Sequence, residues 1–184
     1  MLEATEASPT PFVEHPAITA EKRVELLKKA EDFVAQNALT GEHFIIMQQE
    51  DTVIDDRYYL QYEVTAQKDA YPTSVCRQQY YIDMETEQLY LGIEKKLYAQ
   101  DVVGACMKKM QETLSREKAQ QQLCVLDGEK ERDDGRYYVM HVFSSGAVME
   151  DGTSFAYTYG WYYINMDTME VYKWDVATDT LNKC

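Results

Sequence analysis

Hydrophobic residues follow a helical period twice along the chain, and each helical stretch precedes a series of short strand-like runs. Over about 20 to 39 they recur every three or four positions, up to Gly41. Thr19 directly precedes this stretch and is a suitable N-cap residue. A second apolar stripe with the same spacing covers about 99 to 120. The pattern therefore predicts two amphipathic helices.

After each helical stretch the pattern changes to β-branched and aromatic runs separated by polar turns, which is typical of strands. Four such runs follow each helix. They cover 44–47, 58–64, 75–84 and 89–93 in the first half, and 123–126, 136–143, 155–166 and 171–176 in the second. The polar turn at 83–87 predicts an antiparallel hairpin between the two strands that it joins.

The two halves repeat each other in residue type as well as in order. An offset of 79 aligns their first strands and places Arg57 on Arg136, whereas an offset of 82 places Tyr80 on Tyr162. The extra residues fall in the loop around 146–152, where insertion has a small entropic cost. We therefore expect an α+β fold of two tandem repeats, each with one helix packed on a four-stranded antiparallel sheet. The expected segments are a tether at 1–18, repeat 1 at 19–98 and repeat 2 at 99–184.

Composition limits the partners of the chain. Residues 1–18 contain three prolines, three glutamates and neither lysine nor arginine, which is typical of a flexible tether. The 184 residues include 18 basic and 32 acidic ones, for a net charge of −14. This charge repels phosphate backbones, so we expect no nucleic-acid partner. No apolar run approaches the roughly 18 residues that a transmembrane helix needs.

The four cysteines, Cys76, Cys106, Cys124 and Cys184, form no C-x-x-C pair and have no histidines at ligand spacing. The spacing therefore argues against a zinc site. Two disulfides in any of three pairings, or free buried thiols, remain open. Cys106 lies within the second apolar stripe, which favours packing in the core.

The sequence also lacks the common motifs of catalysis and phosphate binding, among them the nucleophile elbow, the P-loop and the zinc-protease motif. Of the three histidines, His15 lies in the tether, while His43 and His141 lie in strands and are the only candidates for a catalytic base. An ordinary hydrogen-bonded strand histidine is the competing interpretation. Acidic clusters lie in predicted turns without calcium-loop spacing. We expect no enzyme, cofactor or metal site.

One strand is unusually aromatic. Alternation along 155–163 places on one face Phe155, Tyr157, Tyr159, Trp161 and Tyr163. With an offset of 82, the first half has Arg77 and Gln79 at two of these positions, and both are poor core residues. The stripe would then face outward, provided that no bulge interrupts the strand. It either packs, in the core or between the repeats, or binds an external partner.

The stretch 160–172, GWYYINMDTMEVY, resembles the strand ending "gWYYVd-x-x-TGeVY" of a module found in secreted and lipid-anchored proteins of Gram-positive bacteria. This module is similar to the PepSY and cystatin-like group, in which a helix packs on an antiparallel sheet. Met169 replaces the usual turn glycine, and Glu87 replaces it in the first half. The resemblance implies an extracytoplasmic, non-enzymatic binding or inhibitory module. It also implies that the tether follows a lipidated cysteine, which this sequence does not contain.

We therefore expect a module that recognises a protein or peptide at the cell surface through a sheet face, with Tyr157, Tyr159, Trp161 and Tyr163 as the candidate contacts. Two alternatives remain open. The chain is a structural spacer of a cell-surface lipoprotein whose aromatic residues only join its repeats, or it is a small hydrolase-type enzyme that uses His141.

Overall fold

The computed structural model describes residues 18–37, 42–68, 71–119, 122–148 and 154–184. The predicted tether therefore lies outside the described residues, except for Ile18. The first half contains α1 (Ala20–Asn37), β1 (Glu42–Gln48), β2 (Thr52–Ile54), β3 (Arg57–Lys68), β4 (Tyr71–Asp83), β5 (Leu89–Ile93) and β6 (Lys96–Ala99). The second half contains α2 (Gln100–Arg116), β7 (Leu123–Arg132), β8 (Gly135–Val148), β9 (Ser154–Asn165), β10 (Val171–Asp175) and β11 (Thr180–Lys183).

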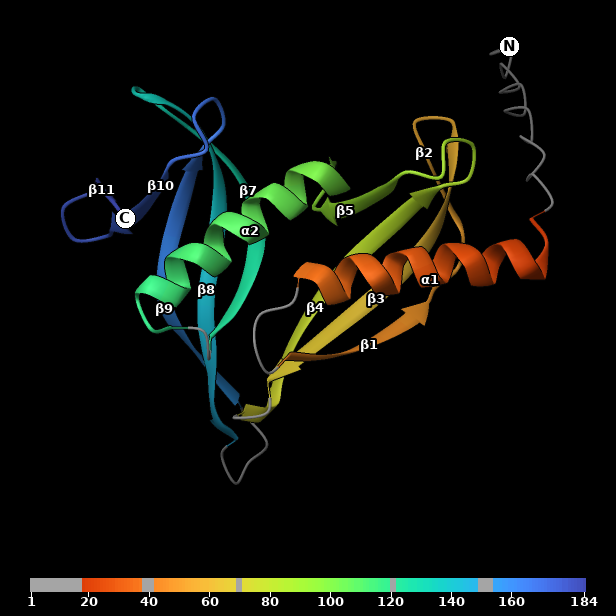
Figure 1. Cartoon of the computed structure of the whole chain (residues 1–184), viewed down its shortest axis with the longest axis horizontal. Coiled ribbons are helices and arrows are strands. Elements are labelled where there is room, and N and C mark those ends of the chain that lie inside the picture. Colours follow the sequence, from red (N-terminus) through yellow and green to blue (C-terminus); the bar gives the residue numbers. More distant parts are fainter. Residues whose placement is uncertain (1–17, 38–41, 69–70, 120–121, 149–153) are drawn as a thin grey trace, which may run out of the picture.

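The strands form two antiparallel sheets (Figure 1). The order in the first sheet is β1-β3-β4-β5-β6, with β2 also paired to β3, and the order in the second sheet is β11-β10-β9-β8-β7. The expected α+β fold with four strands per repeat is therefore wrong, because the described chain is mostly β and its sheets have six and five strands. The pattern missed β2, β6 and β11 because these strands are only three or four residues long, and β6 and β11 follow turns without glycine. Glu94 and Asp179 take the positive φ angles, 55° and 52°, in these turns.

Both predicted helices form, although α2 ends at Arg116 rather than near 120. The backbone N–H of Lys22 donates to Thr19 Oγ1 at 3.2 Å, which confirms Thr19 as the N-cap of α1. One face of each helix is buried in the core, with Leu26 and Ala30 on α1 and Met110 on α2. Cys106 is a buried free thiol whose pKa burial raises to about 12, so its predicted packing role is confirmed.

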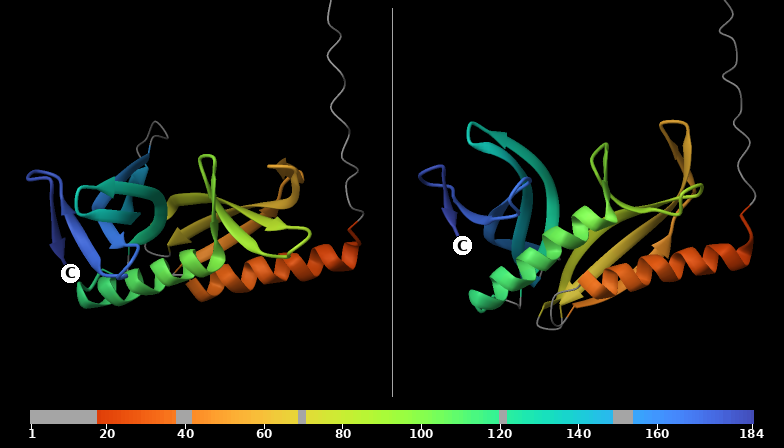
Figure 2. Two further views of the ribbon diagram at one scale, coloured as in Figure 1. Left: turned by 90° about the horizontal axis from the view of Figure 1, so that it is seen from above. Right: turned by 45° about the horizontal axis from the view of Figure 1, so that its top comes forward.

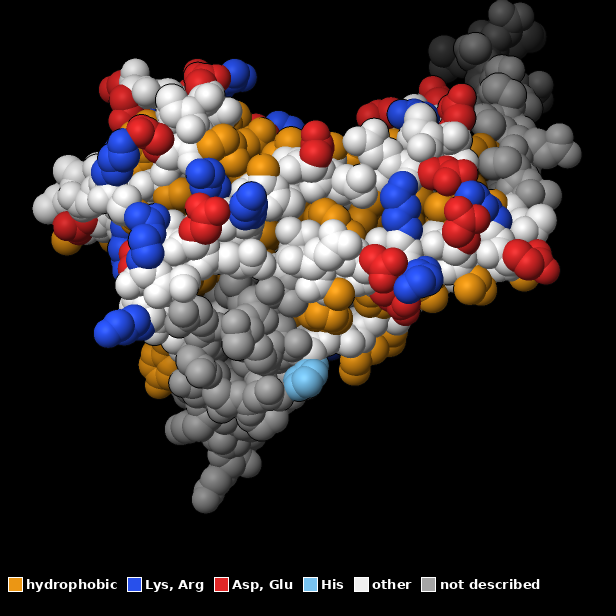
Figure 3. Space-filling view, in the orientation of Figure 1, with side chains coloured by type: hydrophobic (Ala, Val, Ile, Leu, Met, Phe, Trp, Pro, Cys, Tyr) orange, Lys and Arg blue, Asp and Glu red, His pale blue; other side chains and the backbone are white. Residues whose placement is uncertain are grey.

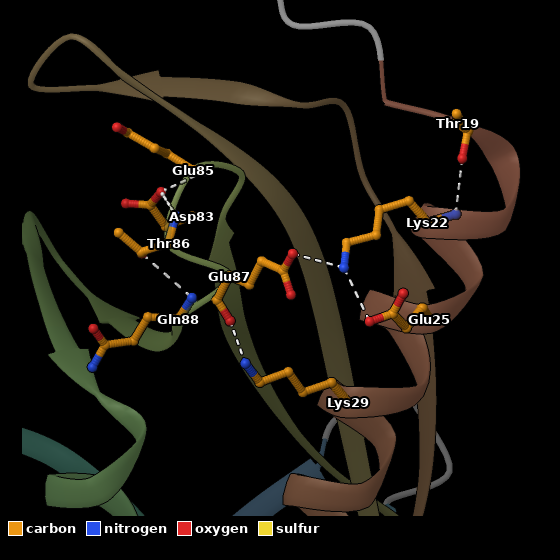
Figure 4. A network of polar contacts seen from close by, with 9 residues as sticks. All are labelled: Thr19, Lys22, Glu25, Lys29, Asp83, Glu85, Thr86, Glu87 and Gln88. Atoms are coloured by element: carbon orange, nitrogen blue, oxygen red, sulfur yellow. Dashed lines mark hydrogen bonds and ion pairs between the residues drawn. The ribbon is translucent and has the colours of Figure 1, made fainter.

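Helix α1 is tied to the turn between β4 and β5 (Figure 4). Lys22 Nζ lies 2.7 Å from Glu87 Oε1 and 3.0 Å from Glu25 Oε1. Two helical turns further on, Lys29 Nζ donates to the backbone carbonyl of Glu87. These contacts fix the N-terminal part of the helix over the first sheet, although each ion pair is partly exposed and so contributes little stability alone.

The two helices lie on one side of the molecule and the sheets lie on the other (Figure 2). Helix α2 contacts β5 and β6 of the first sheet as well as β7 and β10 of the second. The buried residues of both halves belong to one hydrophobic cluster, which includes Leu60 and Ile82 from the first sheet and Met140 and Ile164 from the second. The two halves therefore share one continuous core.

The hairpin turns β4–β5 and β9–β10 have the same hydrogen bonds, which supports the predicted duplication. Asp83 Oδ1 accepts the backbone N–H groups of the residues two and three positions later at 2.9 and 3.0 Å, and Asn165 Oδ1 does the same at 3.0 and 2.9 Å. Glu87 and Met169 both have φ of 56°. Both turns thus have a residue with a left-handed backbone conformation at the position where the motif that the sequence resembles has glycine.

The structure corrects the alignment of the other strands. Asp83 pairs with Tyr59, and its equivalent Asn165 pairs with Tyr137, so β3 and β8 are related by an offset of 137 − 59 = 78. The predicted offset of 79, which placed Arg57 on Arg136, is wrong by one residue. Such a slip exchanges the two faces of a strand. Residues of the two halves are therefore related by an offset of 78 in the strands before the β4–β5 hairpin and by an offset of 82 in the strands of that hairpin.

Candidate functional site

A β-bulge divides the predicted aromatic stripe of β9. Val142 of β8 pairs with Gly160, whereas the next residue, Phe143, pairs with Thr158, so Tyr159 is an extra residue in β9. The side chains before and after the bulge therefore no longer alternate in one register. The expectation that the whole stripe shares one face is wrong, and the predicted contacts fall into two groups.

The first group, Tyr157 and Tyr159, lies on the side that α2 covers, at the C-terminal end of that helix. The hydroxyls of Tyr159 and Tyr162 both donate to Oε2 of Glu117, the C-cap residue of α2, at 3.3 and 2.6 Å. Lys173 Nζ lies 3.6 Å from the same oxygen and 4.3 Å from the centroid of the Tyr159 ring. Burial raises the pKa of Tyr162, and Tyr157 and Tyr159 are 63% and 39% exposed. This cluster joins the helix to the sheet.

The second group lies on the outer face of the second sheet, away from the helices. The rings of Trp161 and His141 are stacked, with centroids 4.0 Å apart and an angle of 9° between the planes. Phe143 stacks on the same imidazole at 4.9 Å and 29°. Thr158 Oγ1 lies 3.0 Å from His141 Nε2. We call Phe143, His141, Trp161 and Trp174 the aromatic platform, and all four side chains are partly exposed.

Tyr163 lies beside this platform on the same face of the sheet, but its side chain is not exposed. Its ring is buried and packs 5.9 Å from Tyr137 and 5.9 Å from Trp174. The first sheet has the same tyrosine packing: Tyr59 lies 6.3 Å from Tyr81, the residue equivalent to Tyr163. Edge-to-face tyrosines are thus part of the scaffold in both halves. Tyr163, predicted as a contact, has a structural role.

The platform itself has no counterpart in the first sheet. The residues equivalent to His141, Trp161 and Trp174 are Glu63, Gln79 and Gly92, which lie side by side on three neighbouring strands. Gln79 Nε2 donates to Glu63 Oε2 at 3.2 Å, and Gln79 Oε1 accepts a hydrogen bond from Gln61 at 3.1 Å. The same scaffold therefore forms with a polar outer face, so folding does not require aromatic side chains at these positions.

The platform is uncharged at neutral pH. Burial lowers the pKa of His141 from its ordinary value of 6.5, and the nearby carboxylate of Asp127 only partly opposes this effect. Burial also raises the pKa of Asp127. A neutral imidazole between aromatic rings offers an apolar surface with one polar edge, the Nε2 that faces Thr158. The hydrolase alternative, in which His141 acts as a base, stays a prediction.

Within the described ranges, no three side chains of histidine, cysteine, aspartate or glutamate are grouped closely enough to hold a metal ion. Neither of the two described helices is long and apolar enough to cross a membrane. The chain matches no known protein family, no curated protein and no solved structure. The resemblance to PepSY and cystatin-like modules therefore stays a prediction.

Proposed function

We propose that the protein is a non-enzymatic binding module that recognises an extended protein or peptide segment through the aromatic platform of the second sheet. One observation carries this proposal: two equivalent sheets have a polar row, Glu63 and Gln79, in one case and a stacked aromatic row, His141 and Trp161, in the other. Exposed aromatic surface that folding does not need is the usual mark of a contact site.

The chemistry of the platform limits the ligand. The exposed parts of the Trp161 and Trp174 rings favour aromatic or proline side chains, because such rings pack on them and remove apolar surface from water. The net charge of −14 disfavours acidic segments. The ligand is thus a neutral or basic segment with aromatic or proline residues.

We place this activity outside the cytoplasm, with the chain anchored through its N-terminal region, on the strength of the resemblance alone. The alternative in which the aromatic residues only join two repeats requires tight burial of the stripe. Tyr157 and Tyr159 are exposed, and Trp161 is only half-buried. These exposures favour binding over a purely structural role.

The proposal is tested by panning a phage-displayed random peptide library against the full chain and measuring the affinities of the enriched peptides by calorimetry. The critical variant, His141→Glu with Trp161→Gln, gives the second sheet the residues of the first. We expect at least a tenfold loss of affinity for this variant with an unchanged circular dichroism spectrum. Because the first sheet tolerates these residues, the variant is expected to fold.

Tyr157→Ala is the matched control, since it removes a more exposed aromatic side chain of the same strand on the other side of the sheet. Its affinity is expected to stay within twofold of the wild type. If Tyr157→Ala abolishes binding while the double variant binds normally, the platform is not the site. Failure of the library to enrich any peptide with aromatic or proline residues contradicts the proposed ligand class.

A further inference from the structure

The outer edge of the first sheet is unusually apolar. Strand β1 pairs only with β3, so its other edge has unpaired backbone groups within the described chain. Phe44 and Ile46 pack against the core, while Ile45 and Met47 on the opposite face are 62% and 46% exposed. Figure 3 shows hydrophobic side chains along the lower rim of the right half, where β1 runs. A strand that is apolar on both faces is typical of a covered strand rather than of an edge.

The other edges of the two described sheets are protected in the ways that natural proteins use. Strands β6 and β11 are four residues long, and they carry Lys96 and Lys183. Strand β7 has a bulge between Leu126 and Gly128 and then a charged end. Among the edges described, only β1 is a regular apolar strand without such protection.

The equivalent positions of β7, the edge strand of the second sheet, are less exposed. Ile45 corresponds to Leu123, which is 2% exposed, and Met47 corresponds to Val125, which is half-buried. The same scaffold position is therefore buried in one half and exposed in the other. An apolar edge strand that is open in this way can pair with an additional segment.

We propose that this segment is β1 of a second copy of the chain, paired antiparallel about a two-fold axis at Ile45. This inference concerns the other sheet and does not rest on the proposed function. In this register Ile45 faces Ile45 of the second copy, Phe44 faces Ile46, and His43 faces Met47. Along 43–47 no charged residue faces a like charge. The strand is thus complementary to itself, as an isologous contact requires.

The net charge of −14 on each copy opposes this association, and at physiological ionic strength salt screens repulsion between exposed charges more than about 8 Å apart. The affinity of the dimer is therefore expected to increase as salt is added. The affinity of a basic partner for the acidic chain would instead decrease with salt. A single strand pair buries less area than a standard interface, so the dimer belongs to the weak class. Sedimentation equilibrium over about 1 μM to 1 mM covers the corresponding range of dissociation constants.

The test uses the full chain with Ile45→Lys, which places two like charges opposite each other on the axis. We expect at least a tenfold increase in the dimer dissociation constant. Val24→Lys is the matched control, because Val24 is 67% exposed on α1 and lies outside the edge. It is expected to change the constant by less than twofold. Monomers at every concentration and salt level, or equal effects of the two variants, overturn the proposal.

A cross-link supplies a second test that does not depend on a destabilising charge. Residues facing each other in antiparallel strands have Cα atoms about 4.5 to 5.5 Å apart, within the range of disulfides. Ile45→Cys, in a chain whose exposed Cys184 is replaced by serine, is therefore expected to oxidise to a covalent dimer. Val24→Cys in the same background is expected to stay monomeric on reducing-agent-free gels. Absence of the Ile45→Cys cross-link overturns the two-fold register.

Discussion

The imidazole of His141 lies flat on the indole of Trp161, with 4.0 Å between the ring centroids. Each ring shields a face of the other from water, which is why burial lowers the pKa of the histidine. The pair also places a titratable group directly on a fluorophore, so its protonation can be followed optically.

Emission from Trp161 in a Trp174→Phe variant is expected to fall as pH falls, with a midpoint below 6.5, because a protonated imidazole quenches indole fluorescence. Above about pH 6.5, His141 is neutral in both the folded and the unfolded chain, and stability is full. Below that pH the unfolded chain takes up the proton first, so stability falls until the folded pKa is reached. A midpoint at or above 6.5, or the same titration in His141→Gln, contradicts this prediction.

Removing the carboxylate of Glu117 is expected to destabilise the fold. Glu117→Ala leaves the buried hydroxyl of Tyr162 without its 2.6 Å partner, at a cost of about 1 to 3 kcal/mol in the free energy of unfolding. Urea denaturation measures this loss. Tyr162→Phe should remove most of the additional effect of Glu117→Ala in a double-mutant cycle, whereas Tyr159→Phe, whose hydroxyl is exposed, should not. Additive effects of Glu117→Ala and Tyr162→Phe are the contrary outcome.

Asp83 combines two roles, of which its equivalent Asn165 keeps only the turn hydrogen bonds. Its Oδ1 accepts two backbone N–H groups of the turn, and its Oδ2 lies 2.6 Å from an Arg57 guanidinium nitrogen. Asp83→Ala removes both and is expected to cost about 3 kcal/mol of unfolding free energy, measured by thermal denaturation. Asp83→Asn keeps the turn bonds, as Asn165 does in the other half, and should cost about half as much. Equal losses in the two variants show that the turn bonds contribute nothing.

Gly92 allows the ring of Tyr81 to lie directly on the backbone. A Cβ at this position would be 2.3 Å from Cε2 of Tyr81, so Gly92→Ala must displace the ring. We expect a loss of about 1 to 3 kcal/mol in unfolding free energy, measured by urea denaturation. Adding Tyr81→Leu should recover part of that loss. A Gly92→Ala protein as stable as the wild type rules out this close contact.

The sequence pattern predicted the features that depend on local chemistry. The helix start at Thr19 and the β4–β5 hairpin are both confirmed. The features that it missed depend on backbone geometry and strand register. Gly160, which directly follows the bulge at Tyr159, is the one local signal of that bulge, and tyrosine-rich strands gave an alignment of Arg57 that was wrong by one residue.

The candidate site was only partly predictable for the same reason. Trp161 was identified from the alternation of β9, but the bulge placed Tyr159 on the other side of the sheet. The sequence presents His141 as a catalytic base or as an ordinary hydrogen-bonded strand histidine, not as part of a contact surface, and it does not single out Trp174. The signal was present in the duplication, since an offset of 82 places Trp174 on Gly92. Comparing the halves position by position, rather than seeking identities, would have found it.

Helix α2 begins the second half, yet it also packs on β5 and β6 of the first. Neither half can keep its hydrophobic surface covered after separation, because each depends on the same helix. We therefore expect the described chain to unfold in one cooperative transition rather than in two. The two halves therefore differ in their outer faces, while the helix that they share makes them a single folding unit.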